Sequence, residues 1–149
     1  MLINNWYVAA AASDVRRDKR LKVRMLACDF VLFRDANGKA ACLSDVCCHR
    51  GASLGKGEMH DCNVVCPYHG WEFDGSGRCT LIPSMGPEVT VPKRVRVDTY
   101  PTQEKYGWVW VFLGDLPESA RPRIPDLFPE YDDPIGWHRI AYHFEAKTN

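Results

Sequence analysis

The sequence predicts an all-β protein, built as an antiparallel sandwich or a small barrel. Short runs of β-branched and aromatic residues alternate with turn signals roughly every 8 to 12 residues, which is typical of these folds. No segment keeps the apolar period of an amphipathic helix, so we expect few and short helices. The chain has 149 residues, of which 46% are hydrophobic and 26% charged, as in one folded domain.

The predicted strands follow one another with recognisable turns between them. The run Lys22–Asp35 is followed by an Asn37–Gly38 turn and by Ala40–Val46, which is the pattern of a hairpin. Further strand signals, with a second hairpin turn at Gly75–Gly77, lie at residues 63–74, 78–82, 94–101 and 106–115. The alternating apolar residues Trp108–Phe112 fit a core strand rather than a stack for a ligand.

The chain changes character after Asp115, which divides it into two parts. Residues 1–115 form the predicted domain. Five prolines lie between Leu116 and Gly136 with little periodicity, as in a connector. Residues 137–149 begin a strand-like pattern that stops midway. We therefore expect residues 116–149 to be a Pro-rich connector and a first strand that lead towards a further domain.

Charge and hydropathy exclude several functions. The 19 basic and 19 acidic residues cancel, so no overall positive field is available to hold nucleic acid. No apolar run approaches the roughly 18 residues that cross a bilayer, and the start lacks the basic residues of a signal peptide. We expect a cytoplasmic protein with no membrane partner. The basic run Arg16–Arg24 predicts a solvated strand edge, or else a docking patch for an acidic electron-transfer partner.

Seven cysteines are many for a cytoplasmic chain, because a reducing compartment disfavours a disulfide framework. Cys28, Cys42 and Cys79 lie in or near strand-like runs and are predicted to be small core residues. Cys62, like Cys48, is interpreted as a bystander.

Two short stretches, "CCHRG" and "CPYHGW", each combine a thiol with an imidazole. On an extended backbone Cys47 and His49 share one face while Cys48 points the other way. With Cys66 and His69 they form the pattern C-x-H-x16-C-x2-H, and a glycine follows closely after each histidine. Two cysteines and two histidines on two loops predict a metal centre with four protein ligands.

Two kinds of centre suit this ligand set. Two thiolates and two imidazoles can form a closed tetrahedral zinc site. They can also hold a Rieske [2Fe–2S] cluster, in which two cysteines bind one iron and two histidines the other. Zinc fingers pair like ligands within each short turn, whereas here each loop supplies one cysteine and one histidine. This spacing favours the two-iron cluster and leaves a zinc-stabilised interaction module as the alternative.

The two stretches resemble the ligand loops of a known family. "CCHRGASL" and "CPYHGWEFD" are similar to the loops in the N-terminal Rieske domain of Rieske non-haem iron oxygenases. The opening "LINNWYVAA" is similar to that of the demethylase-like members, which act on aromatic acids, aryl ethers and related methyl compounds. The resemblance covers about residues 2–145. It implies a Rieske-type antiparallel β-sandwich with a smaller cluster-binding subdomain formed by the two ligand loops.

The resemblance also implies roles for individual residues. Cys47 and Cys66 would be the thiolate ligands of the cluster, and His49 and His69 its imidazole ligands. The proline-containing segment Ile82–Gly86 resembles a third loop that covers the cluster.

Five neighbouring residues also match the family pattern. Gly51 and Gly70 would let backbone N–H groups approach the cluster, because glycine has no Cβ. Arg50, Tyr68 and Trp71 would shield or orient the ligands.

One departure concerns the Rieske proteins of respiratory cytochrome complexes. Their two additional, mutually bonded cysteines are replaced here by Ala52 and Tyr68, and a serine that donates to the cluster is replaced by Trp71. Fewer hydrogen bonds stabilise the reduced cluster less. We therefore expect a reduction potential near the low end of the Rieske range, roughly −150 mV.

The function that the resemblance implies is electron transfer. In this family the domain receives electrons from a reductase or ferredoxin. It passes them to a mononuclear non-haem Fe(II) in a catalytic domain of the same or a neighbouring subunit, where two histidines and a carboxylate hold the iron. His138 and His143 match only part of that motif, and His60 is predicted to be an exposed loop residue. We expect the electron-transfer half of a mono- or dioxygenase, with no catalytic iron site of its own.

A second interpretation within the redox class is a stand-alone Rieske ferredoxin, against which the Pro-rich segment argues. The zinc module of the other class would be colourless and redox-inactive. The resemblance implies a homotrimer for the full-length form and a monomer or weak oligomer for this chain. Substrate choice belongs to the catalytic domain, so this sequence predicts no substrate.

Overall fold

The computed structural model describes residues 3–126 together with residues 135, 136, 140 and 142. Within this part the elements are eleven strands and three single-turn 3-10 helices, with no α-helix. All strand pairs are antiparallel. The predicted all-β, antiparallel class is confirmed.

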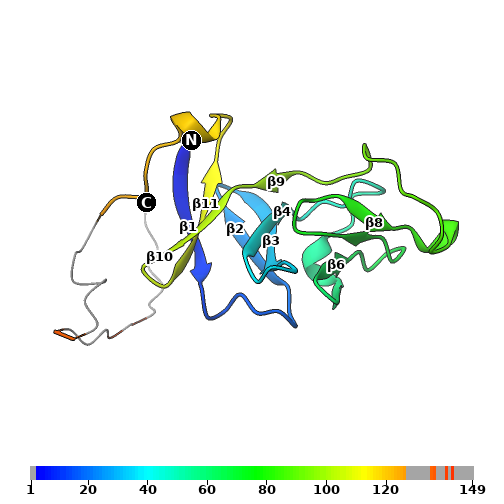
Figure 1. The fold of residues 1–149 in the computed structure, drawn as a ribbon, viewed down its shortest axis with the longest axis horizontal. Coiled ribbons are helices and arrows are strands. Elements are labelled where there is room, and N and C mark those ends of the chain that lie inside the picture. Colours follow the sequence, from blue (N-terminus) through cyan, green and yellow to red (C-terminus); the bar gives the residue numbers. More distant parts are fainter. Residues whose placement is uncertain (1–2, 127–134, 137–139, 141, 143–149) are drawn as a thin grey trace.

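The strands form three small sheets, which Figure 1 shows one after another along the long axis. The first, sheet I, has the order β1 (Asn5–Ala11), β11 (Trp108–Leu113), β10 (Thr102–Lys105). Sheet II has the order β2 (Leu21–Met25), β3 (Cys28–Arg34), β4 (Ala40–Ser44), β9 (Thr99–Tyr100). Sheet III has the order β5 (Glu58–His60), β6 (Asn63–Val65), β7 (Glu72–Phe73), β8 (Cys79–Leu81).

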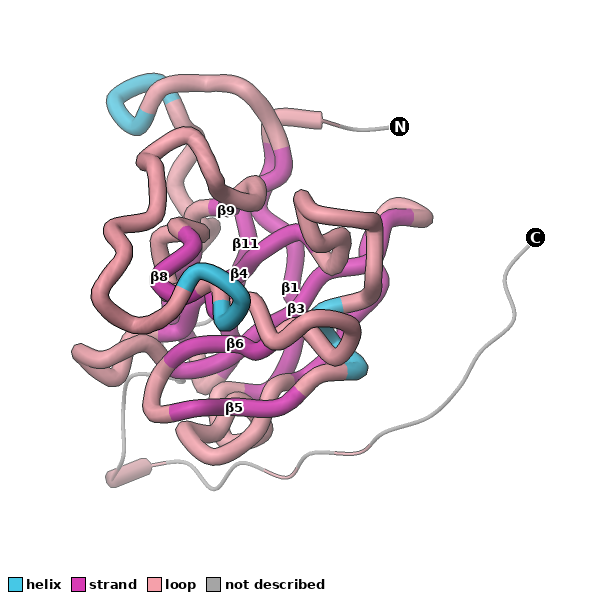
Figure 2. The backbone as a smooth tube through the Cα atoms, turned by 90° about the vertical axis from the view of Figure 1, so that its right-hand side faces the viewer, coloured by secondary structure: helices cyan, strands magenta, loops and turns pink. Residues whose placement is uncertain are grey.

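The 3-10 helices lie in the connections. They are η1 (Leu54–Lys56), η2 (Pro83–Met85) and η3 (Glu118–Ala120). Figure 2 looks onto the end of the molecule where β5, β6 and β8 lie nearest the viewer. This end is the smaller subdomain, and it holds both predicted ligand loops.

Sheet II packs against a hydrophobic core on each of its faces. Successive strand residues point to opposite faces. Phe30 and Leu32 belong to the core shared with sheet I, and Val31 and Phe33 to the core shared with sheet III. All four are at most 3% exposed, as expected for a strand that reads as an unbroken apolar run.

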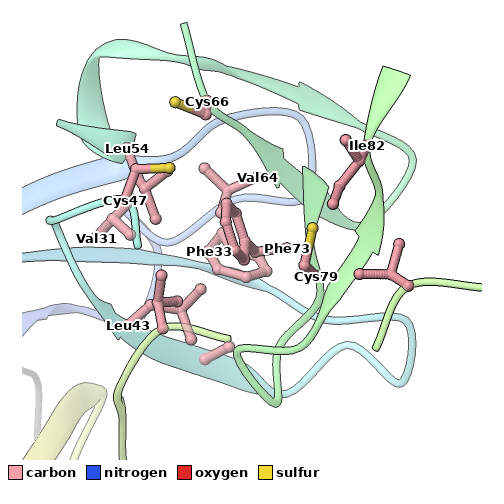
Figure 3. Close-up of a cluster of buried hydrophobic side chains, with 13 residues drawn as sticks. Val31, Phe33, Leu43, Cys47, Leu54, Val64, Cys66, Phe73, Cys79 and Ile82 are labelled. Carbon is pink, nitrogen blue, oxygen red and sulfur yellow. The ribbon is translucent and has the colours of Figure 1, made fainter. Parts of the chain in front are cut away.

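The core between sheets II and III extends to the ligand loops. It contains Phe33, Phe73 and Val64 together with three cysteines, Cys47, Cys66 and Cys79. Figure 3 shows the sulfur atoms of these cysteines at the edges of this group of side chains. The two predicted thiolate ligands are therefore attached to a rigid, dry core.

Two cysteine predictions are confirmed and one is wrong. Cys42 and Cys79 are buried core residues. Burial raises the pKa of the Cys42 thiol to about 12. Cys28, however, is exposed, because Leu26 and Ala27 take positive φ angles of 48° and 64° and turn the chain. The predicted single run Lys22–Asp35 is thus a tight hairpin of β2 and β3, with Cys28 beside its turn.

The basic run lies where the sequence placed it, at an edge. β2 is the edge strand of sheet II, and its Lys22 and Arg24 are exposed. Both pair with Asp29 on β3, at 2.9 Å and 3.6 Å.

The connector lies against sheet I as far as the structure describes it. Trp6 donates its indole N–H to the carbonyl oxygen of Pro122 at 2.7 Å, and Ile124 is buried. Residues 127–134 and most of residues 137–149 lie outside the described part, and so do His138, His143 and the predicted strand there. In the described residues, no helix is long and apolar enough to cross a membrane.

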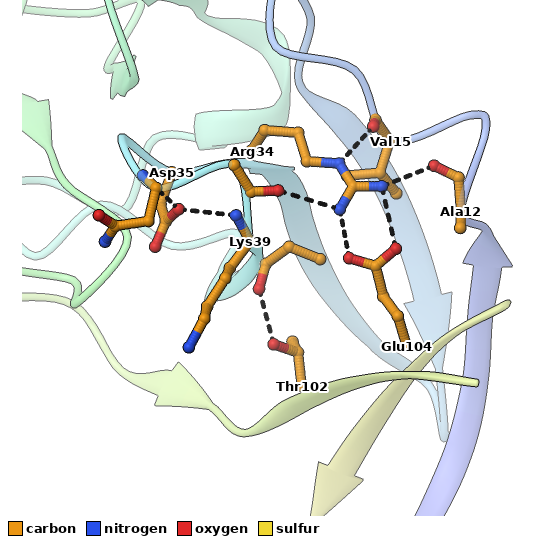
Figure 4. Close-up of polar contacts among 10 residues, drawn as sticks. Ala12, Val15, Arg34, Asp35, Lys39, Thr102 and Glu104 are labelled. Atoms are coloured by element: carbon orange, nitrogen blue, oxygen red, sulfur yellow. Dashed lines mark hydrogen bonds and ion pairs between the residues drawn. The ribbon is translucent and has the colours of Figure 1, made fainter. Parts of the chain in front are cut away.

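Arg34, at the end of β3 in sheet II, contacts β10 of sheet I and the segment that follows β1 (Figure 4). Its side chain is 15% exposed and pairs with Glu104 on β10. It also donates to the carbonyl oxygens of Val15 and Ala12, both at 2.8 Å, and of Gly38 at 3.3 Å. One guanidinium thus satisfies three carbonyl groups and a carboxylate.

We predict that Arg34→Met lowers the free energy of unfolding by about 2–4 kcal/mol, because the carboxylate and the carbonyls lose their shared donor. Urea unfolding followed by circular dichroism measures the change. The matched control is Arg16→Met, since Arg16 forms an ion pair with Asp18 in which both side chains are 58% exposed; it should cost less than about 1 kcal/mol. Equal losses in the two variants would contradict this account of Arg34.

Candidate metal centre

The first ligand loop, Cys47–Ala52, is closed by two backbone hydrogen bonds. The Cys47 N–H donates to the carbonyl oxygen of Ala52 at 2.9 Å, and the Gly51 N–H donates to that of Cys47 at 2.9 Å. Gly51 has a φ of 70°, a conformation that non-glycine residues rarely adopt. An isolated bridge between Val46 and Ser53 flanks the loop.

The second ligand loop, Cys66–Trp71, repeats this frame. The Cys66 N–H donates to the carbonyl oxygen of Trp71 at 2.8 Å, and the Gly70 N–H donates to that of Cys66 at 3.0 Å. Gly70 has a φ of 69°, and the pair Val65 and Glu72 flanks the loop. Both loops are hairpin tips with the same hydrogen-bond pattern.

The two glycines let each loop fold back on itself. Their own N–H groups donate to the cysteine carbonyl oxygens, and the expectation that they let backbone N–H groups approach a cluster stays a prediction. What requires glycine is the positive φ that lets each loop fold back on its cysteine.

The predicted cysteine ligands are buried, whereas the predicted histidine ligands are closer to the surface. Cys47 and Cys66 are 2% and 3% exposed, whereas His49 is half-buried and His69 exposed. Cys48 is exposed, so the alternation expected around Cys47 is seen. Burial raises the pKa of the Cys47 thiol to about 12, and the neighbouring Cys66 thiol adds to the rise.

The two predicted imidazole ligands lie side by side at the surface. The ring centroids of His49 and His69 are 4.7 Å apart. The Trp71 ring stacks on His49 at 4.3 Å with an interplanar angle of 4°, and the Tyr68 ring lies 4.0 Å from His69. Each imidazole therefore has an aromatic neighbour from the second loop that limits its rotation.

Charge and desolvation favour a neutral His49. Removal from water, then the positive charges available on His69 and Arg50, lower the pKa of His49. A neutral imidazole is the form that binds a metal. Arg50 itself is exposed.

The third loop contacts the second. Pro83 of η2 lies beside Gly70, and a Cβ placed on Gly70 would lie 3.1 Å from Pro83 Cγ. The expected covering segment Ile82–Gly86 thus packs directly on a ligand loop.

A buried aspartate holds the first loop in place. Asp45 is 3% exposed; it accepts hydrogen bonds from the Ser53 hydroxyl at 2.6 Å and from the Gly55 N–H at 2.5 Å. Lys22 Nζ lies 2.8 Å from the same carboxylate. Sequence reasoning missed this residue, because one aspartate among many gives no sign that it is buried.

Sequence reasoning also missed the partner of His60. This histidine is exposed, as predicted, but it ends β5 rather than lying in a loop. Its Nδ1 is 2.8 Å from Oε1 of Glu72, a carboxylate buried at the foot of the second loop.

The arrangement fits one kind of metal centre better than another. The thiols meet in the core and the imidazoles meet at the surface, so like ligands from the two loops are paired. A two-iron cluster needs only the paired arrangement, with thiolates on one iron and imidazoles on the other.

The chain is similar to several known oxygenases. A 4beta-methylsterol monooxygenase of Methylococcus capsulatus is 39% identical over 128 residues, covering 83% of this chain and 35% of that protein. A chloroplastic chlorophyllide a oxygenase of Chlamydomonas reinhardtii is 38% identical over 127 residues, covering 81% of this chain and 19% of that protein. The crystal structure of dicamba monooxygenase with non-heme iron and dicamba has a TM-score of 0.75 at 34% identity, covering 89% of this chain and 40% of that one.

The fold and the paired ligand loops thus define an iron–sulfur domain of the kind found in oxygenases. The Rieske [2Fe-2S] domain family matches residues 5–101, and the chain belongs to this family. The resemblance drawn from the two loops is confirmed, and so is the Rieske cluster as the cofactor of the fold. The chain spans between about a fifth and two fifths of the length of these relatives.

We predict that Gly70→Ala destabilises the protein more than Gly51→Ala. Both substitutions force a Cβ into a positive φ, at about 1–2 kcal/mol. Only the Gly70 Cβ also meets a neighbour, Pro83, whereas nothing lies within 4 Å of a Cβ on Gly51. Thermal unfolding of the two variants under the same conditions measures the difference. Equal stability of the two variants would mean that Pro83 does not pack on Gly70.

Proposed function

We propose that this chain is the electron-transfer domain of a Rieske non-haem iron oxygenase. In this proposal Cys47 and Cys66 hold one iron of the [2Fe–2S] cluster, and His49 and His69 hold the other. The observation that carries it is the pairing of two buried thiols and two surface imidazoles on loops of identical hydrogen-bond pattern. When bound, a Rieske cluster accepts and releases single electrons.

The residues of this chain keep the thiol side dry and the imidazole side accessible. Val64 and Phe73 exclude water beneath Cys47 and Cys66. A low-dielectric surrounding of this kind makes a charged cluster more sensitive to nearby charges and hydrogen bonds.

Exposed hydrophobic side chains lie in or beside the three loops. Tyr68 belongs to the second ligand loop, Val46 directly precedes the first, and Met85 and Val89 lie in and after the third. Exposed apolar groups gathered on one side of a domain mark an interaction site. This supports electron exchange through the histidine side, with a partner that covers these residues.

The rest of the assembly belongs to the proposal as well. The electron donor is a reductase or ferredoxin. The acceptor is a mononuclear non-haem iron in a catalytic domain of the same or a neighbouring subunit, within a homotrimer of the full-length protein. The domain division, residues 1–115 and a connector over residues 116–149, follows the same scheme. It is supported by the end of β11, the last strand of the described residues, at Leu113.

The proposed compartment is the cytoplasm. All seven cysteines are free thiols in the structure, which suits a reducing compartment. The chlorophyllide a oxygenase named above is chloroplastic, so the compartment varies among relatives.

The proposal predicts which thiol and imidazole substitutions remove the cluster. Cys47→Ala and His69→Ala should each reduce bound iron and acid-labile sulfide to near zero, because each removes a ligand. Cys48→Ala is the matched control, one residue from Cys47 but exposed, and it should keep two irons and two sulfides per chain. Iron and sulfide analysis with the visible absorption spectrum measures all three variants.

Two results would overturn the assignment. Loss of iron in Cys48→Ala would show that the wrong cysteine has been chosen. One zinc per chain in the wild-type protein, lost in Cys47→Ala and His69→Ala, would favour the zinc-stabilised module instead.

A further inference from the structure

A buried carboxylate lies at the foot of the second ligand loop. Glu72 follows Trp71 in the chain and is paired in register with Val65, the residue before Cys66. Since neighbouring strands lie about 4.8 Å apart, Glu72 is within about two residue lengths of Cys66. Its side chain is 11% exposed. A charge so placed, three residues after His69 in the chain, has little water to screen it.

His60 is the ion-pair partner of Glu72 among the described residues. The distance from His60 Nδ1 to Glu72 Oε1 is 2.8 Å, while the His60 side chain remains 64% exposed. The hydrogen bond to Glu72, then the charges of Glu72 and Asp61, raise the pKa of His60. The ring can therefore exchange protons with water while it contacts a buried anion.

The other groups around the pair are two neutral side chains and two exposed carboxylates. Asn63 on β6 points its amide at Glu72 Oε2, 3.5 Å away, and at the Thr80 hydroxyl on β8, 3.3 Å away. Asp61, in the turn after β5, and Glu58, two residues before His60, are exposed carboxylates. Among the residues that the structure describes, His60 is thus the one group hydrogen-bonded to Glu72 that can change charge near neutral pH.

Glu72 also borders the core beneath the ligand loops. It pairs in register with Leu81 on β8, two residues from Cys79, and its chain neighbour Phe73 pairs with Cys79 itself. Cys79 belongs to the same buried core as Cys47 and Cys66 (Figure 3).

We propose that the His60–Glu72 pair is a proton-binding site coupled to the oxidation state of the cluster. This inference rests on the proposed function, since it needs a cluster at the second loop. Reduction of a cluster held there, by a one-electron donor such as a reductase or an electrode, would increase the proton affinity of His60, so that the ring would take up to one proton from water. In the neutral ring Nδ1–H donates to Glu72, so the incoming proton binds Nε2 and leaves an imidazolium beside the carboxylate.

The sign of the coupling follows from charge. The reduced cluster carries one more negative charge, so it favours the protonated pair, and the protonated pair favours the reduced cluster to the same extent. The potential is therefore higher at pH values below the His60 pKa and falls as the pH rises through it. Because Glu72 raises that pKa, the fall is centred above the ordinary pKa value of an imidazole.

The test compares midpoint potentials of cluster-loaded wild type and His60→Gln between pH 5.5 and 9, by spectroelectrochemistry. Below the His60 pKa the wild type should have the higher potential, and the difference should close as the pH rises. Any titration of the ligand imidazoles cancels in this difference. Asp61→Asn is the matched control, and should keep the shape of the wild-type profile with its midpoint moved slightly to lower pH.

A second readout follows the proton itself. Nitrogen-15 NMR of the His60 ring should give a higher pKa in the reduced than in the oxidised protein, and Glu72→Gln should lower both values. The coupling is overturned if the wild type and His60→Gln differ by a constant potential at all pH values, with the His60 pKa the same in both oxidation states. That result would leave the proposed function standing, whereas a protein with no reversible one-electron couple overturns both.

Discussion

The backbone hydrogen bonds that close the two ligand loops are the constraint on which the rest of the site depends. In each loop the cysteine donates its N–H to the carbonyl five residues on and accepts from the glycine four residues on. This frame turns the cysteine inward while the residues between cysteine and glycine stay near the surface. The two loops contain the same frame, with their cysteines 19 residues apart at Cys47 and Cys66. The frames bring the two thiols together in the core and the two histidine rings together at the surface.

The middle sheet makes this constraint effective. Because β3 and β4 bury residues on both faces, sheet II can support the larger sandwich on one side and the smaller subdomain on the other. The thiols thus belong to a close-packed core, whose side chains have little freedom to move. Asp45 and Lys22 then join the first ligand loop to the edge of the same sheet. The positions of the candidate ligands are therefore fixed by the packing of the two loops on the sheets, and not by flexible segments.

The sequence predicted most of the strands, the hairpin turns and the four candidate ligands, because these depend on local pattern and spacing. It did not predict β1, β5 or β10, and the predicted run 63–74 is in fact β6 and β7 with the second ligand loop between them. Asn37–Gly38 forms the expected turn, with Gly38 at a φ of 79°, and Cys47 and Cys48 alternate between inside and outside. The turn at Leu26 and Ala27 was missed, since neither residue signals a positive φ. The buried Asp45 and Glu72 were missed as well, because the burial of a carboxylate depends on tertiary packing and not on its local sequence. The contact between His60 and Glu72 could not be predicted either, because the two residues lie on different strands and no local sequence pattern connects them.

The measurement that tests the account most directly is low-temperature EPR of the dithionite-reduced wild-type protein, with pulsed detection of coupled nitrogen. The account predicts an anisotropic signal with a low average g value and two coupled nitrogens, one from each imidazole, because two thiolates and two imidazoles then divide between two irons. A fully metal-loaded protein that gives no signal and contains one zinc per chain would contradict it.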